Sequence, residues 1–149
     1  VNNAGVAYSG AFAAMDAEDV SRMVLLNAAT LASLTRLLVT DMVARGSGRI
    51  LNVSSLSAFQ AVPVMALYAA TKAFVLSFTE ALAEELKGKV RVNAVLPSII
   101  DTPQNRKDMP TVDPNIWVSP GDLAKAMLFL ASDDARAITG ALVPVTGQV

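Results

Sequence analysis

The chain has 149 residues, of which 53% are hydrophobic, 5% aromatic and 17% charged, with a formal net charge of −1. It holds no Cys and no His, which excludes disulfides, thiolate catalysis and imidazole chemistry, and we expect no metal site. It also lacks a basic run, about 18 consecutive apolar residues and a leader signal, so we expect no nucleic acid, no membrane span and a cytoplasmic location.

The first half of the chain reads as a strand end, a long helix and a strand. Residues 1–5 (VNNAG) are typical of a strand that runs into a loop, and because they open the chain we expect a fragment of a larger domain. Apolar residues then recur every three or four positions up to Arg45, which predicts an amphipathic helix. Asp16 is its expected N-cap, with Asp19 in a capping-box-like position. The aliphatic residues 49–54 (RILNVS) predict the next strand.

The second half continues this alternation. The patterns predict, in order, a helix over residues 67–87, a strand over 90–96, a helix over 120–132 and a strand over 141–146. Ser119 is the expected N-cap of the last helix. Residues 98–118 contain three prolines and no clear periodicity, which predicts a long, functional loop with at most a short helix. Alternating strands and helices indicate an α/β fold with a parallel sheet, whose ligands bind beyond the carboxyl ends of the strands.

Tyr68 and Lys72 form the most informative polar pair. They lie four residues apart at the start of a predicted helix, so their side chains share one face. A nearby ammonium lowers the pKa of a phenol from its usual value of about 10, and a shift of two to three units requires about 3–4 kcal/mol. Tyr68 would then exchange protons near neutral pH. Such a pair is also common on helix surfaces, so the spacing alone does not assign chemistry.

Two further polar positions have both a functional and a structural explanation. Ser54 and Ser55 follow a predicted strand, where a hydroxyl can donate to a substrate oxygen or simply stabilise a turn. Asn27 interrupts the apolar face of the first helix. A buried amide must be hydrogen-bonded, so Asn27 is either satisfied by the backbone or holds a water molecule for proton transfer.

Taken together, the segments VNNAG, RILNVSS, YAATKAFV, VRVNAVLPSIIDT and ITGALVPVTG resemble the short-chain dehydrogenase/reductase superfamily from Val1 to about Gly147. Ser55 precedes Tyr68 by thirteen residues, and Lys72 follows it by four, as in that superfamily. The resemblance implies a Rossmann-like, doubly wound parallel sheet with helices on both faces. Residues 1–149 would be its C-terminal catalytic part, without the N-terminal strands and their glycine-rich phosphate loop.

The same resemblance implies hydride transfer between the nicotinamide of NAD or NADP and a small carbonyl or secondary alcohol. Tyr68 would be the acid/base, and Lys72 would lower its pKa and bind the nicotinamide ribose. Ser55 would polarise the carbonyl, and Asn27 would hold a water linked to Lys72. Besides Tyr68 and Lys72, the residues implied to contact the cofactor are Asn3, Ala4, Gly5, Pro97, Ser98, Ile100 and Thr102. Members of the superfamily commonly pair their long helices, which implies a homodimer or homotetramer.

Two alternatives remain at this point. Residues 98–117 (SIIDTPQNRKDMPTVDPNIW) resemble the corresponding loop of dihydropteridine reductases, although the presence of Ser55 favours a carbonyl or alcohol over a pterin. The second alternative is that the chain is a non-catalytic relative that binds a nucleotide. Ser98 stands where the superfamily usually has glycine, a change that we expect to be tolerated. The choice between NAD and NADP, the substrate and the reaction direction are not encoded in these segments.

Overall fold

The computed structural model describes residues 1–148 and contains a parallel three-stranded sheet. Its strands are β1 (Gly48–Val53), β2 (Val90–Pro97) and β3 (Leu142–Val145), in that order. Asn2 extends the sheet on the free side of β1: its N–H donates to Leu51 O (2.8 Å), and its carbonyl accepts from Val53 N (3.0 Å). The predicted strand end at the start of the chain is therefore confirmed by backbone pairing.

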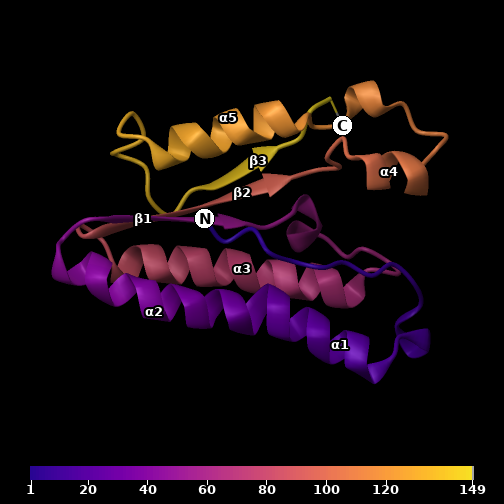
Figure 1. The fold of residues 1–149 in the computed structure, drawn as a ribbon, viewed down its shortest axis with the longest axis horizontal. Coiled ribbons are helices and arrows are strands. Elements are labelled where there is room, and N and C mark those ends of the chain that lie inside the picture. Colours follow the sequence, from indigo (N-terminus) through magenta and orange to yellow (C-terminus); the bar gives the residue numbers. More distant parts are fainter. Residues whose placement is uncertain (149) are drawn as a thin grey trace.

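Helices cover both faces of the sheet, as predicted (Figure 1). One face carries α3 (Ala66–Glu85) and a long helix made of α1 (Ala17–Val24), a π-helical turn and α2 (Leu31–Ala44). The other face carries α5 (Pro120–Ala131). The connection from β2 to α5 contains α4 (Pro103–Asp108) and a 3-10 helix (Pro114–Ile116), so the predicted loop is more ordered than expected. The architecture is α/β and Rossmann-like.

The long first helix differs from its prediction in two details. Residues Leu25–Thr30 are π-helical, and this wider turn contains Asn27. Asp16 is the N-cap but makes no side-chain cap hydrogen bond, and Asp19 pairs with Arg22 (2.9 Å) instead of completing a capping box. Ser119, by contrast, caps α5 as predicted, because its hydroxyl accepts from Asp122 N (3.0 Å).

The core has one layer on each side of the sheet. Between the sheet and α5, the buried residues are Leu51, Val53, Val95, Val118, Leu123 and Leu130. Between the sheet and α3, they are Ile50, Leu76, Ala83, Val90, Val92, Ala94 and Leu96. Because alternate residues of β1 and β2 enter different layers, both strands need apolar side chains on both faces, and the buried polar exceptions are Asn52 and Asn93. This explains the apolar runs in the sequence.

A buried polar network ties the sheet to the helices. Asn2 Nδ2 donates to Asn52 Oδ1 (2.8 Å) and to Thr35 Oγ1 (3.0 Å) on α2. Asn52 Nδ2 in turn donates to Thr79 Oγ1 (2.9 Å) on α3. The network fixes the segment around Asn2, and therefore the loop that follows it, relative to both helices.

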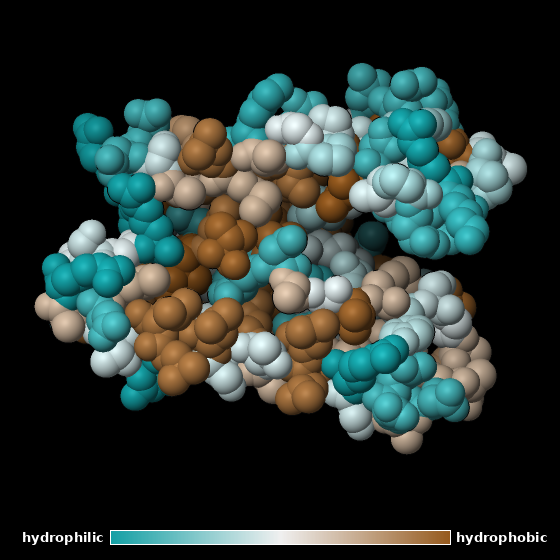
Figure 2. Space-filling view, viewed as in Figure 1, coloured by the Kyte–Doolittle hydropathy of each residue, from teal (hydrophilic) through white to brown (hydrophobic). Residues whose placement is uncertain are grey.

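The outer side of the long helix is apolar. Figure 2 shows brown surface over α2 and α3. The continuous helix Ala17–Ala44 is long and apolar enough to cross a membrane by length and composition alone. Core helices of soluble proteins pass the same test, so a single such helix is weak evidence for a membrane span.

Candidate active site

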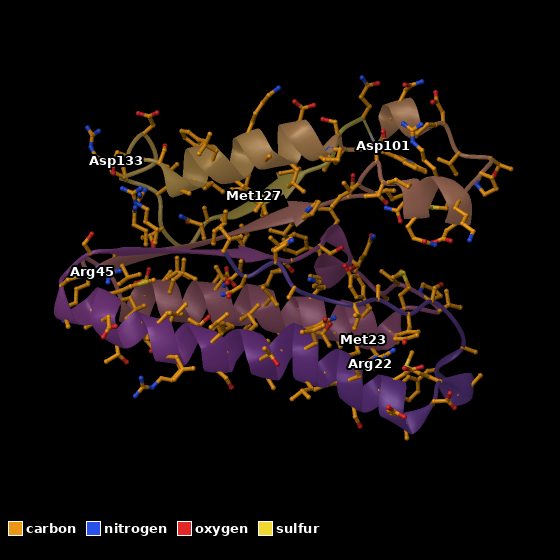
Figure 3. All side chains as sticks on the ribbon, in the orientation of Figure 1. Arg22, Met23, Arg45, Asp101, Met127 and Asp133 are labelled. Carbon is orange, nitrogen blue, oxygen red and sulfur yellow. The ribbon has the colours of Figure 1, made fainter. Side chains whose placement is uncertain are left out.

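A cleft of about 700 Å³ opens at the carboxyl ends of β1 and β2, where a parallel sheet is expected to bind ligands. Asp101, in the segment after β2, and Arg22, on α1, lie at this end of the molecule, opposite Arg45 and Asp133 (Figure 3). The cleft lies between the loop that follows Asn2, the segment after β1, the start of α3 and the segment after β2.

Tyr68 and Lys72 share one face of the first turns of α3, as their spacing predicts. Lys72 is 6% exposed, and its Nζ donates to the carbonyl oxygen of Val53 (3.0 Å) at the end of β1. The same Nζ lies 5.7 Å from the centroid of the Tyr68 ring. Ser54 Oγ donates to the Lys72 carbonyl (2.9 Å), which fixes this turn of α3 against the strand end.

The pKa values of this pair differ from the sequence expectation. Burial raises the pKa of Tyr68 above 10.0, and a hydrogen bond with Ser55 opposes this rise only in part. Burial also lowers the pKa of Lys72. The Lys72 ammonium lies over the Tyr68 ring and donates to Val53 O. Burial therefore outweighs proximity, and Tyr68 holds its proton at neutral pH.

Ser55 has the turn-stabilising role and also lines the cleft, while its contact with a substrate oxygen remains a prediction. It is the N-cap of a 3-10 helix (Leu56–Phe59), and its oxygen accepts from Ser57 N (3.2 Å) and Ser57 Oγ (2.9 Å). Both serines line the cleft. Because both of these bonds end on the Ser55 oxygen, its hydroxyl proton is available to donate, and the hydrogen bond with Tyr68 uses it at the cleft.

Asn27 is 2% exposed, and its amide is fully engaged. Its Oδ1 accepts from Val6 N (2.9 Å), and its Nδ2 donates to Val6 O (2.8 Å) and Thr71 Oγ1 (3.1 Å). A Cβ atom on Gly5 would lie 3.2 Å from Asn27 Oδ1 and 3.6 Å from Lys72 Nζ, so a glycine lets the loop approach both side chains. The hydrogen bonds of the Asn27 amide are thus made largely to the Val6 backbone. The water molecule that Asn27 was expected to hold near Lys72 remains a prediction.

Most of the residues expected to contact a cofactor meet at the cleft. Those that line it are Asn3, Gly5, Tyr68, Lys72, Pro97, Ser98 and Ile100. Ala4 instead lines a smaller pocket beside Leu26, and Thr102 caps α4 by accepting from Asn105 N (3.1 Å). Ser98 Oγ donates to Thr146 O (2.8 Å), so its side chain is accommodated by the segment after β3.

The family model for short chain dehydrogenases matches residues 1–113. The chain belongs to the short chain dehydrogenase family. Among curated proteins, it is 33% identical over 156 residues to the 3-oxoacyl-[acyl-carrier-protein] reductase of Thermotoga maritima, covering 99% of this chain and 63% of that protein. It is also 33% identical to the acetoacetyl-CoA reductase of Paracoccus denitrificans, covering 94% of this chain and 62% of that protein. The chain therefore spans less than two thirds of the length of these relatives.

Solved structures show the same fold. The 3-ketoacyl-(acyl-carrier-protein) reductase of Brucella melitensis, complexed with NADH, has a TM-score of 0.84 and 34% identity, covering 99% of this chain and 66% of its own. The gluconate 5-dehydrogenase of Burkholderia cenocepacia, in complex with NADP and tartrate, has a TM-score of 0.89 and 25% identity, covering 98% of this chain and 62% of its own. Both support the Rossmann-like assignment.

Several cleft residues were not predicted individually from the sequence. They come from the loop after Asn2 (Val6 and Ala7), from the segment between β1 and α3 (Leu56, Gln60, Val62 and Met65), and from the predicted functional loop after β2 (Ile99, Asn105 and Met109). None belongs to a periodic pattern, and only their position after a strand end could have identified them. Asn105 is held in place because its Nδ2 donates to Ile100 O (2.7 Å).

Proposed function

We propose that the chain forms the catalytic part of an NAD- or NADP-dependent oxidoreductase that interconverts a carbonyl and a secondary alcohol. The observation that carries this proposal is the meeting of Ser55, Tyr68 and Lys72 in one cleft at the carboxyl ends of the strands. The relatives described above support it, because they are named as reductases of 3-oxoacyl and acetoacetyl compounds and one is complexed with NADH.

The cleft fits a nicotinamide. It is large enough for a flat amide-bearing ring, and its walls combine apolar and uncharged polar groups from the Gly5 loop and the Pro97–Ile100 segment. Gly5, Pro97, Ser98 and Ile100 would hold the ring, and Asn3 and Lys72 would contact the adjoining part of the dinucleotide. When bound, the dinucleotide supplies or accepts the hydride.

The chain's own residues handle the proton. In the reducing direction, the phenol of Tyr68, which holds its proton at neutral pH, donates that proton to the carbonyl oxygen as negative charge develops there. The Ser55 hydroxyl donates a hydrogen bond to the same oxygen and polarises the carbonyl. Lys72 positions Tyr68 from below its ring, and Asn27 positions the loop that contains Gly5. A Ser55 hydroxyl in the cleft favours a carbonyl over the pterin alternative.

The decisive test is Tyr68→Phe in the complete gene product. This change removes one hydroxyl, and we expect turnover with NADH or NADPH to fall by about 10²–10⁴-fold while the dinucleotide still binds. Tyr8→Phe is the matched control, because Tyr8 bonds to Arg22 outside the cleft. Unchanged turnover in Tyr68→Phe would refute the proposal, and so would an equal loss in both variants.

The apolar outer face of the long helix supports association into a homodimer or homotetramer. Its exposed apolar residues, with one from α3, are Val24, Leu25, Leu34, Leu37, Leu38 and Phe74. Such a contiguous face marks an interaction surface. Leu37, at 73% exposed, is central to the test: Leu37→Asp should shift the complete protein to a smaller species in size-exclusion chromatography. Recovery of the unmodified protein only with membranes would contradict both the association and the cytoplasmic location.

A further inference from the structure

The charge of the cleft lining restricts what can enter it. Among the residues that the structure describes, Lys72 is the only charged side chain that lines the cleft. An anionic group placed inside would leave water and find no counter-ion, which is strongly unfavourable. Lys72 cannot serve as the counter-ion for an anionic group at the end of a substrate remote from the carbonyl. Its ammonium is buried against the Tyr68 ring and donates a hydrogen bond to Val53 O.

The two cationic residues next to the cleft residues Asn105 and Met109 in the sequence, Arg106 and Lys107, do not line the cleft. Arg106, on α4, donates to both carboxylate oxygens of Asp101 (2.6 and 2.7 Å). Lys107 is exposed on the same helix and does not line the cleft. The segment after β2 therefore offers an entering carboxylate no free cation inside the cleft.

Part of the cleft lining is apolar. It includes four half-buried side chains, which we call together the apolar wall: Leu56, Val62, Met65 and Met109. Leu56, Val62 and Met65 lie between Ser55 and Tyr68 in the sequence, so the wall adjoins the two hydroxyls proposed to bind the carbonyl. Two of the four are methionines, whose flexible side chains adapt to apolar groups of different shape.

Two exposed apolar residues adjoin cleft residues in the sequence. Phe59 precedes Gln60 and is 58% exposed, and Val64 precedes Met65 and is 54% exposed. The segment that holds them is tied down, since Gly10 N donates to Val64 O (2.8 Å). Exposed apolar side chains at the border of an apolar wall extend the surface on which a hydrocarbon chain can lie.

From this lining we infer that the substrate is a ketone, or the corresponding alcohol, whose substituent is uncharged and apolar and lies against the apolar wall. Free keto acids and sugar acids are excluded as good substrates, and uncharged alkyl or acyl ketones are favoured. Met109 is a specificity-determining residue, because it is the part of the wall contributed by the segment after β2. The inference rests on the proposed oxidoreductase function.

The test compares two substrates of one skeleton in the complete gene product. They are 4-oxopentanoate and its ethyl ester, assayed by oxidation of NADH or NADPH. We expect kcat/KM for the ester to exceed that for the free acid by about 30-fold or more, because the carboxylate loses its hydration without gaining a partner. A ratio of about tenfold or more supports the inference, and a smaller ratio overturns it. No oxidation with the ester would also overturn the inference, whereas the proposed function is tested separately by Tyr68→Phe.

Met109→Lys tests the wall directly. It places a cation inside the cleft, so the preference for the ester should fall by about tenfold or more. Val112→Lys is the matched control: it adds the same charge three residues away, at an exposed position outside the cleft, and should leave the preference unchanged. Equal effects of the two variants would overturn the assignment of Met109. If Met109→Lys does not fold, Met65→Lys probes the same wall with the same expected outcome.

Discussion

Replacing Asn27 by alanine tests how the loop after Asn2 is held in place. The Asn27 amide makes both side-chain hydrogen bonds to the Val6 backbone and a third to Thr71 on α3. Thr71 keeps another partner, because its hydroxyl also donates to Tyr68 O (2.8 Å). Alanine therefore leaves the N–H and the carbonyl of Val6 as the groups without protein partners.

The expected cost follows from these two groups. An unpaired buried donor or acceptor costs about 1–3 kcal/mol. Val6 is half-buried, so water can reach it in part, and we expect Asn27→Ala to lower the free energy of unfolding by about 2–4 kcal/mol. That is a large fraction of the roughly 5–15 kcal/mol available to a natural domain. Cofactor binding should weaken as well, because Gly5 adjoins Val6 in the same cleft.

The assay is urea unfolding of the complete protein, combined with amide hydrogen exchange. Exchange at Val6 N should accelerate in the variant, because opening of the loop no longer breaks a hydrogen bond. Asn115→Ala is the matched control, since Asn115 is exposed, and it should stay within about 0.5 kcal/mol of the unmodified protein. A loss below about 1 kcal/mol in Asn27→Ala, with Val6 still protected, would refute the reasoning.

Three further predictions concern single positions. Gly147 has φ +65°, and a Cβ atom there would lie 2.8 Å from a backbone oxygen. Gly147→Ala should therefore lower the free energy of unfolding by about 1–3 kcal/mol in urea unfolding. Gly10→Ala is the control and should be nearly neutral, because a Cβ atom on Gly10 would meet open space. Thr79→Val removes the acceptor of Asn52 Nδ2 and should cost about 1–3 kcal/mol in the same assay, and an unchanged midpoint would contradict the importance of that hydrogen bond. Because burial raises the Tyr68 pKa, the stability contributed by this group is present below pH 10.0 and is lost as the pH rises through the folded pKa. The tyrosinate absorbance of Tyr68 is obtained by subtracting the titration of Tyr68→Phe from that of the unmodified protein. Its midpoint should lie above pH 10.0, and a midpoint below pH 10.0 would contradict the dominance of burial.

Regular elements were predictable because their patterns are local. The strand expected at residues 49–54 is observed at Gly48–Val53, and the helix expected at 67–87 is observed at Ala66–Glu85. The π-helical turn at Leu25–Thr30 was not predictable, since its sequence LLNAAT continues an ordinary helical pattern. The failed capping box has a similar cause: Asp19 has a competing partner, Arg22, one turn further along the helix.

The candidate site was predictable where spacing or a motif determines it. Four residues of helix bring Tyr68 and Lys72 to one face, and strand ends bring Asn3, Ser55 and Pro97 to one edge of the sheet. Partners distant in sequence were not predictable. Asn27 bonds to a backbone 21 residues away and Lys72 to one 19 residues away, contacts that only the folded chain creates. The apolar wall is of the same kind, because its members share no pattern.

Burial, which spacing cannot reveal, opposes ionisation of both members of the Tyr68–Lys72 pair. Proximity alone predicts an ammonium beside a phenolate, yet burial raises the pKa of Tyr68 and lowers that of Lys72. Both shifts disfavour the doubly charged pair. Under the proposed function, a substrate that covers the cleft removes more water and strengthens the same preference. The phenol would then keep its proton until negative charge develops on the carbonyl oxygen, at which point transfer from Tyr68 becomes favourable. An apolar substituent against the wall of Leu56, Val62, Met65 and Met109 would contribute to this exclusion of water, which links the proposed substrate class to the proposed proton transfer.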